Sequence, residues 1–203
     1  MSPAERIEAV AERSPLVRAA LEQARSDHAG QVRNGSGGMP YIDHPIAVAA
    51  RLDEHGYGEE VLAAALLHDV VEDSETTLDE LREKFGGEVA GLVGALTDDQ
   101  SIDSYRERKA EHRERLAAAG GEALAIYAAD KLTNSSTLRA TFAEEGDLVR
   151  AEFKVPLELK LEIWEEDLEL LREKAAELPF LDELATELGR FRACLEAPAP
   201  PRG

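Results

Sequence analysis

The sequence predicts a single domain built only from α-helices. Only 5% of its 203 residues are aromatic, β-branched runs are short, and alternating strand-like stretches are missing. Apolar residues recur instead three and four positions apart, as on one face of a helix. We expect about ten helices, near residues 3–13, 15–29, 45–55, 59–71, 78–85, 87–96, 103–119, 122–141, 156–177 and 181–195.

Local signals mark where these helices begin and end. Ser2 and Ser14 each stand directly before a proline, which pairs a cap with the residue favoured at the first helical position. We expect Asp43 to cap the third helix in the same way. A threonine at position 76 or 77, followed by Glu80, is typical of a capping box. Glycines at positions 30, 56 and 86 are expected to end helices.

The chain is expected to form one domain over residues 1–196, because no linker divides it. Hydrophobic residues make up 43% of the sequence, enough for a core. The glycine-rich stretch 30–43 is expected to form a loop that closes over a ligand. Residues 197–203 are expected to form a disordered tail. Leucines and Trp164 recur at three- and four-residue steps in 157–171 and are expected to cover the core. An oligomer interface is the alternative for that stripe.

Charge and composition exclude several function classes. The formal net charge of −19 argues against binding to nucleic acids or acidic membranes, whose phosphates it would repel. No run approaches the roughly 20 apolar residues of a membrane span, and the N-terminus lacks a signal-peptide pattern. Cys194 is the single cysteine, so no disulfide framework or thiolate metal cluster is expected. We expect a cytoplasmic protein.

One segment places four chemically active side chains at the end of an apolar helix. In "ALLHDVVED", His68 and Asp69 are followed within one turn by Glu72 and Asp73. If the helix continues, His68 with Glu72 and Asp69 with Asp73 form two adjacent ridges. Burying such charges is costly without compensation, and a divalent cation would supply it. The alternative is a helix end that frays into solvent.

Two other segments supply residues of the same kind. In "EALAIYAADKLTNSSTLR", Tyr127, Asp130, Asn134 and Thr137 share one face of an otherwise apolar helix. Such a polar stripe is expected to line a cavity, although a solvated face is the alternative. His44 opens an amphipathic helix after the glycine-rich loop. Taken alone, the position of His44 predicts a cap-region or core residue.

These blocks resemble a known family. "HAGQVRNGSGGMPYIDHPIAVAARL", "LAAALLHDVVEDSETTLDELREKFGGEVAGLVGALTDD", "RERKAEHRER" and "ALAIYAADKLTNSSTLR" occur in this order between His28 and Arg139. Together they are similar to the HD-domain phosphohydrolases, in particular the small alarmone hydrolases and the hydrolase half of the RelA/SpoT proteins. The resemblance implies a single HD-domain helical bundle.

The resemblance also implies a role for each candidate residue. It places one Mn²⁺ ion, with Fe²⁺ or Zn²⁺ as alternatives, on His44, His68, Asp69 and Asp130. It implies that Glu72 and Asp73 orient and deprotonate the attacking water. It assigns substrate binding to Arg33, which would pack on the base, to Asn134 and Thr137, which would contact the nucleotide, and to Lys109, near the pyrophosphate.

The activity that follows is Mn²⁺-dependent hydrolysis of the alarmone (p)ppGpp to GDP or GTP and pyrophosphate. A divalent cation lowers the pKa of a bound water by several units and stabilises charge on phosphoryl oxygens. Asn34 and Tyr127 depart from the family pattern near the base and phosphates. Another phosphorylated nucleotide, such as (p)ppApp or NADPH, is therefore an alternative substrate. A non-catalytic HD binding module is the third hypothesis.

Overall fold

A computed structural model describes residues 1–197 and confirms the all-α class. Its helices are α1 (Pro3–Arg13), α2 (Pro15–Asp27), α3 (Asp43–Glu54), α4 (Glu59–Leu67), α5 (Val70–Asp73), α6 (Leu78–Leu96), α7 (Tyr105–Ala119), α8 (Gly121–Glu145), α9 (Asp147–Ala151), α10 (Leu157–Lys174) and α11 (Leu181–Glu196). Within this part of the chain the extended backbone pairs only in one isolated bridge, between Val32 and Pro40. The predicted tail, apart from residue 197, lies outside the described residues.

Three of the predicted helix starts have the expected caps. The Ser2 hydroxyl accepts a hydrogen bond from the Glu5 amide in a capping box, and Ser14 caps α2. Thr77 caps α6 in a second capping box. The prediction for Asp43 was wrong, because α3 begins at Asp43 itself without a side-chain cap. The preceding residues already turn helically, since the His44 amide donates to the carbonyl of residue 41.

The helix boundaries differ from the predictions at several points. The helix expected over 59–71 is broken at His68 and Asp69, so α4 and α5 are separate segments. The two helices expected over 78–85 and 87–96 are confirmed: α6 comprises both, and they meet at a non-helical Gly86, where φ is 90°. A positive φ favours glycine, and the glycine at this position is the reason that the sequence pattern predicts two helices. The short helix α9 was not predicted.

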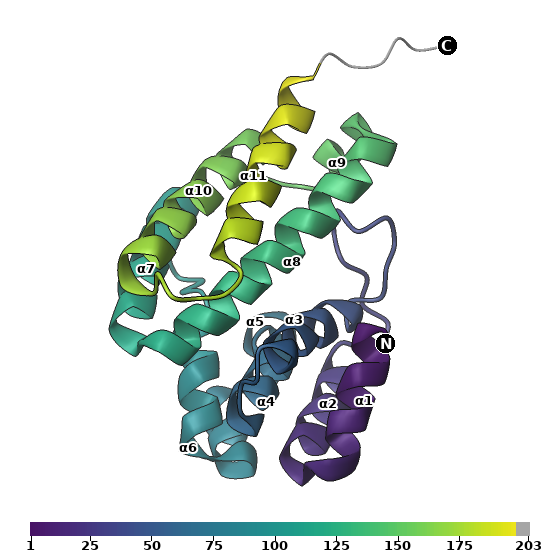
Figure 1. Ribbon diagram of the computed structural model, residues 1–203, viewed down its shortest axis with the longest axis vertical. Helices are drawn as coiled ribbons and strands as arrows, with labels where there is room; N and C mark the ends of the chain where they lie inside the picture. Colours follow the sequence, from purple (N-terminus) through teal and green to yellow (C-terminus); the bar gives the residue numbers. More distant parts are fainter. Residues whose placement is uncertain (198–203) are drawn as a thin grey trace.

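The helices enclose one continuous hydrophobic core. Helix α4 is buried from Val61 to Leu67 and packs against α2, α3, α6 and α8. The long helix α8 runs from this lower group up to α9 and α11 (Figure 1). Every helix of residues 1–197 is too short or too polar to span a bilayer.

Helix α10 closes one side of the core, as its leucine stripe predicted. The stripe residues are all buried, with exposed fractions of 6% or less: Leu157, Leu161, Trp164, Leu168 and Leu171. They pack against α7, α8 and α11. This burial explains the stripe without an oligomer interface.

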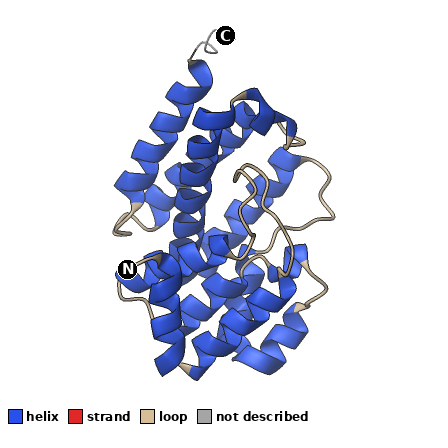
Figure 2. Ribbon diagram, turned by 90° about the vertical axis from the view of Figure 1, so that its right-hand side faces the viewer, coloured by secondary structure: helices blue, strands red, loops and turns tan. Residues whose placement is uncertain are grey.

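The glycine-rich loop between α2 and α3 lies at the right of Figure 1 and faces the reader in Figure 2. At Gly35, φ is 70°, and an added Cβ would meet Leu138 and Phe153 at 2.7 Å. The Gly35 amide donates to the Glu152 carboxylate at 2.6 Å. The loop is therefore held against α8 and the segment before α10.

Candidate functional site

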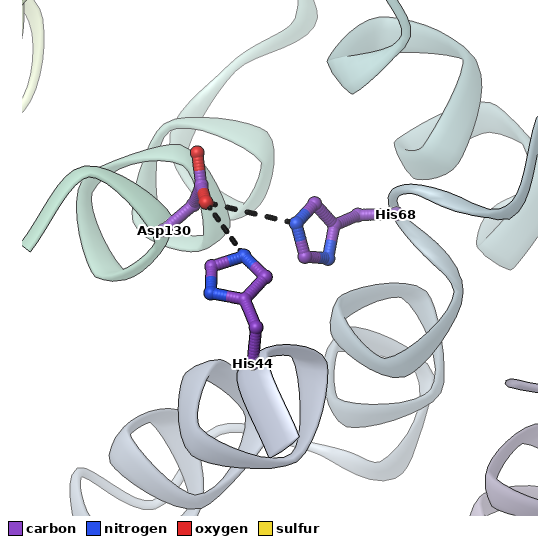
Figure 3. A group of neighbouring side chains, drawn as sticks. All are labelled: His44, His68 and Asp130. Atoms are coloured by element: carbon purple, nitrogen blue, oxygen red, sulfur yellow. Dashed lines mark ion pairs between the residues drawn. The ribbon is translucent and has the colours of Figure 1, made fainter. Parts of the chain in front are cut away.

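Three polar side chains meet where the ends of α3 and α4 approach the middle of α8. His44 comes from the first turn of α3, His68 follows α4, and Asp130 projects from α8 (Figure 3). Nε2 of His44 lies 3.0 Å and Nε2 of His68 lies 3.7 Å from Oδ1 of Asp130. All three side chains are buried. One potential ligand atom from each lies within 4.8 Å of the others.

The geometry of the two imidazoles fits a shared cation. Both Nε2 atoms are buried and have no hydrogen-bond partner, although an Asp130 oxygen is close to each. Nδ1 of His68 is 2.7 Å from the Ala65 carbonyl oxygen, which fixes the ring and leaves Nε2 to face Asp130. Buried polar atoms without partners are costly, and imidazole nitrogen with carboxylate oxygen is a common donor set for divalent metals.

The two imidazoles have opposite pKa shifts in the metal-free protein. Burial, followed by the Arg33 charge, lowers the pKa of His44 to about 4. Burial also acts to lower the pKa of His68, but Asp69 and Asp130 outweigh it and raise the value to about 9. At neutral pH the cluster therefore holds a proton on His68. Binding of a metal by both rings requires release of that proton.

Asp69 lies beside the three-residue cluster and is partly exposed. Its Oδ1 atom is 3.2 Å from Nε2 of His68, and its Oδ2 atom is 3.8 Å from Nε2 of His44. The Tyr41 hydroxyl lies 2.9 Å from Oδ2 of Asp69 and 2.6 Å from Oδ2 of Asp73. Tyr41 thus links Asp69, the fourth of the predicted metal ligands, to Asp73.

Glu72 has a separate set of partners. Its Oε1 atom accepts a hydrogen bond from the Asp98 amide at 2.7 Å, and Oε2 accepts one from the Gln100 side chain at 3.3 Å. Burial raises the pKa of Glu72 to about 7, with further contributions from the Asp98 and Asp69 charges. A carboxyl group with this pKa exchanges protons readily at neutral pH.

A small cavity at the cluster shares part of its lining with a larger one. The smaller, of about 170 Å³, is lined by His68, Asp69, Asp130 and Glu72. The larger, of about 500 Å³, is lined by Asp73, by loop residues and by aromatic side chains. A cavity of the larger size is typical of small-molecule sites. Five side chains line both cavities: Arg33, Tyr41, Asn134, Lys160 and Trp164.

The predicted nucleotide-contacting residues are arranged around these cavities. Arg33 donates a hydrogen bond to the Asn134 side-chain oxygen, and its guanidinium lies 5.3 Å from the centre of the Tyr41 ring. Asn134 donates in turn to Oδ1 of Asp130 at 2.6 Å. Thr137 lines the larger cavity. The polar stripe of α8 thus runs from the cluster into the larger cavity.

Lys109 is engaged by another residue of the smaller cavity. Its Nζ atom is 2.6 Å from Oδ2 of Asp98, and Asp98 is also 2.8 Å from Nδ1 of His112. Lys109 still lines the smaller cavity. Its charge, however, is compensated by a buried carboxylate.

Several side chains that line the smaller cavity were not predicted from the sequence, among them Tyr41, Lys131 and Lys160. Lys131 is 7% exposed and lies 2.8 Å from Asp130. A charged residue beside Asp130 in an apolar helix was an available signal for it. Tyr41 carries no such signal. Lys160 follows leucines of the core stripe, and only the packing of α10 brings it to the cavity.

The helical fold and the buried cluster of His44, His68 and Asp130 fit an HD-domain protein. Residues 20–155 match the family model described as "HD domain", and the chain belongs to that family. The chain is similar to the guanosine-3′,5′-bis(diphosphate) 3′-pyrophosphohydrolase of Aquifex aeolicus, with 36% identity over 154 residues that cover 73% of this chain and 22% of that protein. It is 44% identical over 126 residues to the human enzyme of that name, MESH1, covering 61% of this chain and 69% of that protein.

A solved structure supports the same relationship. The structure described as a metazoan ortholog of SpoT that hydrolyzes ppGpp matches with a TM-score of 0.71 and 30% identity, covering 87% of this chain and 97% of that one. The matched segment spans about a fifth of the Aquifex protein, and 62% and 65% of the zebrafish and mouse MESH1 enzymes.

Proposed function

We propose that this chain is a divalent-metal-dependent hydrolase that removes the 3′-pyrophosphate of (p)ppGpp, giving GDP or GTP and pyrophosphate. The observation that carries the proposal is the convergence of the Nε2 atoms of His44 and His68 on one oxygen of Asp130, beside a nucleotide-sized cavity. The names of the relatives support the substrate. We propose a cytoplasmic location, in line with the sequence prediction.

In this proposal, His44, His68, Asp69 and Asp130 hold one metal ion. When bound, the metal supplies Lewis-acid stabilisation of the phosphoryl oxygens and lowers the pKa of water. Two imidazoles with two carboxylates favour Mn²⁺ or Fe²⁺ over a structural zinc site. Tyr41 holds Asp69 in place through its hydroxyl, and Asn134 does the same for Asp130.

Glu72 is the residue proposed to take the proton from the attacking water. It lines the smaller cavity, whereas Asp73 lines the larger one. The backbone amide of Asp98 fixes the carboxylate, and its raised pKa suits a base at neutral pH. The water oxygen bonds to the phosphorus attached to the 3′ oxygen and that P–O bond breaks. The proton taken by Glu72 is returned to the 3′ oxygen, so the nucleotide leaves with a free 3′ hydroxyl. Asp73 acts through Tyr41, which it helps to orient.

The larger cavity is proposed to bind the nucleoside. The guanidinium of Arg33 lies over the Tyr41 ring, 5.3 Å from its centre, and its other face is proposed to stack on a base. Asn134 and Thr137 lie along the same wall and supply polar contacts. Asn34, which departs from the family pattern, also lines this cavity, so base recognition is the feature to test.

A substrate panel tests this proposal. Metal-free protein is incubated with Mn²⁺ and with ppGpp, ppApp or NADPH, and pyrophosphate and phosphate release are measured. We expect pyrophosphate from ppGpp, at a higher kcat/KM than from ppApp, and slower phosphate release from NADPH. Preferred turnover of another nucleotide would show that this nucleotide, and not (p)ppGpp, is the substrate. No turnover of any of them with metal bound would support a non-catalytic module.

A further inference from the structure

Three lysines from three helices line the smaller cavity: Lys109 of α7, Lys131 of α8 and Lys160 of α10. Two of them are paired with carboxylates. Lys109 lies 2.6 Å from Asp98 and Lys131 lies 2.8 Å from Asp130. Their positive charges are compensated within the protein, so they offer little net charge to a ligand.

Lys160 is different because it has no such partner. Within residues 1–197, no carboxylate oxygen lies within 4.0 Å of its Nζ atom. The ammonium group lies over aromatic rings, 5.1 Å from the centre of Phe153, 5.4 Å from Trp164 and 5.8 Å from Tyr105. Such faces attract a cation but accept no strong hydrogen bonds. Its three N–H donors therefore remain for a ligand.

The surroundings of Lys160 indicate an anionic ligand. Burial, followed by the charges of Lys109, Lys131 and Arg33, lowers the pKa of Lys160 to about 7. A phosphate group at this point would be the negatively charged partner that the ammonium group of Lys160 lacks. It would favour the charged form of Lys160. The smaller cavity is also lined by carboxylates, including Asp69, Asp130 and Glu72. These carboxylates would repel a polyanion, so a cation without a carboxylate partner favours its entry.

We propose that Lys160 binds the diphosphate group of the ligand where the two cavities meet. Lys160 lines both cavities, so a ligand that extends from the larger to the smaller must pass it. The residue lies beyond the segment that matches the HD-domain model, which ends at residue 155. Helix α10 thus adds a binding residue to the HD core. The identity of the nucleotide attached to this diphosphate rests on the proposed function, whereas the binding of pyrophosphate by Lys160 does not.

Equilibrium dialysis of radiolabelled inorganic pyrophosphate against the full-length chain, loaded with one equivalent of Mn²⁺, tests this proposal. We expect Lys160→Met to weaken binding by at least about tenfold, because a charge-assisted contact is lost. Lys160→Arg, which keeps the charge, should stay within about threefold of the wild type. Lys154→Met is the matched control, since Lys154 is an exposed lysine just before α10, and it should bind as the wild type does.

Thermal unfolding separates a binding role from a structural one. Removal of a desolvated cation without a carboxylate partner should leave the midpoint of Lys160→Met unchanged or higher. Lys160→Gln provides a second neutral variant if methionine does not fit among the rings. Wild-type affinity in both neutral variants, or no pyrophosphate binding by the wild type, would overturn the proposal. So would loss of binding in Lys109→Met but not in Lys160→Met.

The outcome is separable from that of the proposed function. Lys160-dependent pyrophosphate binding in a chain that hydrolyses none of the nucleotides would refute the proposed function and leave Lys160 as a diphosphate-binding residue. Hydrolysis of ppGpp with wild-type pyrophosphate affinity in Lys160→Met would refute the role of Lys160 and leave the function standing.

Discussion

Asp69→Asn is expected to lower the ppGpp hydrolysis rate by at least about 1,000-fold and to weaken Mn²⁺ binding by at least about 100-fold. The substitution keeps the shape of the side chain and an oxygen that can accept from the Tyr41 hydroxyl. It removes one negative charge beside His68 and His44. The expected loss therefore reports on the metal and not on the fold. Metal affinity is measured by competition with a chelator, and hydrolysis by pyrophosphate release.

Asp79→Asn is the matched control for this substitution. Asp79 lies in the first turn of α6, and its side chain is 89% exposed. The control should match the wild type in both measurements and in its unfolding temperature. Full activity in Asp69→Asn would remove Asp69 from the ligand set and leave the cluster of His44, His68 and Asp130.

Glu72→Gln is expected to reduce kcat by about 10²- to 10⁴-fold, the range for loss of a general base, with little change in KM. Glutamine keeps an oxygen that can accept from the Asp98 amide, so the loop that carries Asp98 stays in place. Mn²⁺ affinity should remain within about threefold of the wild type, since Glu72 is not a proposed ligand. A loss of metal affinity equal to that of Asp69→Asn would contradict the division of roles between the two residues.

The pH dependence of kcat gives a second signature of Glu72. Because the pKa of Glu72 is raised to about 7, the basic form predominates only above that pH. The wild-type rate should rise as the pH increases from 6 to 8, and this rise should be absent in Glu72→Gln. A wild-type rate that is flat across this range would argue against Glu72 as the base.

The same raised pKa makes Glu72 unfavourable for stability at higher pH. The folded protein holds the proton more tightly than the unfolded chain, where the ordinary pKa is 4.5. The free energy of unfolding of the metal-free wild type, relative to Glu72→Gln, should therefore fall as the pH rises from about 4.5 through 7, by about 1 to 3 kcal/mol. Denaturant unfolding of both proteins at pH 5 and pH 8 measures the difference.

Features that depend on a few neighbouring residues were predictable from the sequence. The caps at Ser2, Ser14 and Thr77 are local, and so is the kink at Gly86. The break after α4 was not predictable, because His68 keeps helical backbone angles there and apolar periodicity continues through it. A short segment such as α9 carries too few residues for a periodic pattern.

The candidate site was predictable only in part. Spacing along one helix placed Asp130 and Asn134 on one face, but it gave no distance to His44 or His68. That meeting of three segments was expected only from the family resemblance. The pairing of Lys109 with Asp98 and the arrival of Lys160 from α10 depend on helix packing, which a single sequence does not reveal. The proposal for Lys160 therefore could not be drawn from the sequence, and the prediction for Lys109 near the pyrophosphate stays a prediction.

Titration of metal-free protein with Mn²⁺ tests the central claim most directly. Bound metal is counted by elemental analysis while pyrophosphate release from ppGpp is followed in the same samples. Activity should be absent without metal, rise in proportion to bound Mn²⁺ and reach its plateau at one ion per chain. Full activity in the metal-free protein, or no pyrophosphate release with one ion bound at His44, His68, Asp69 and Asp130, would contradict it.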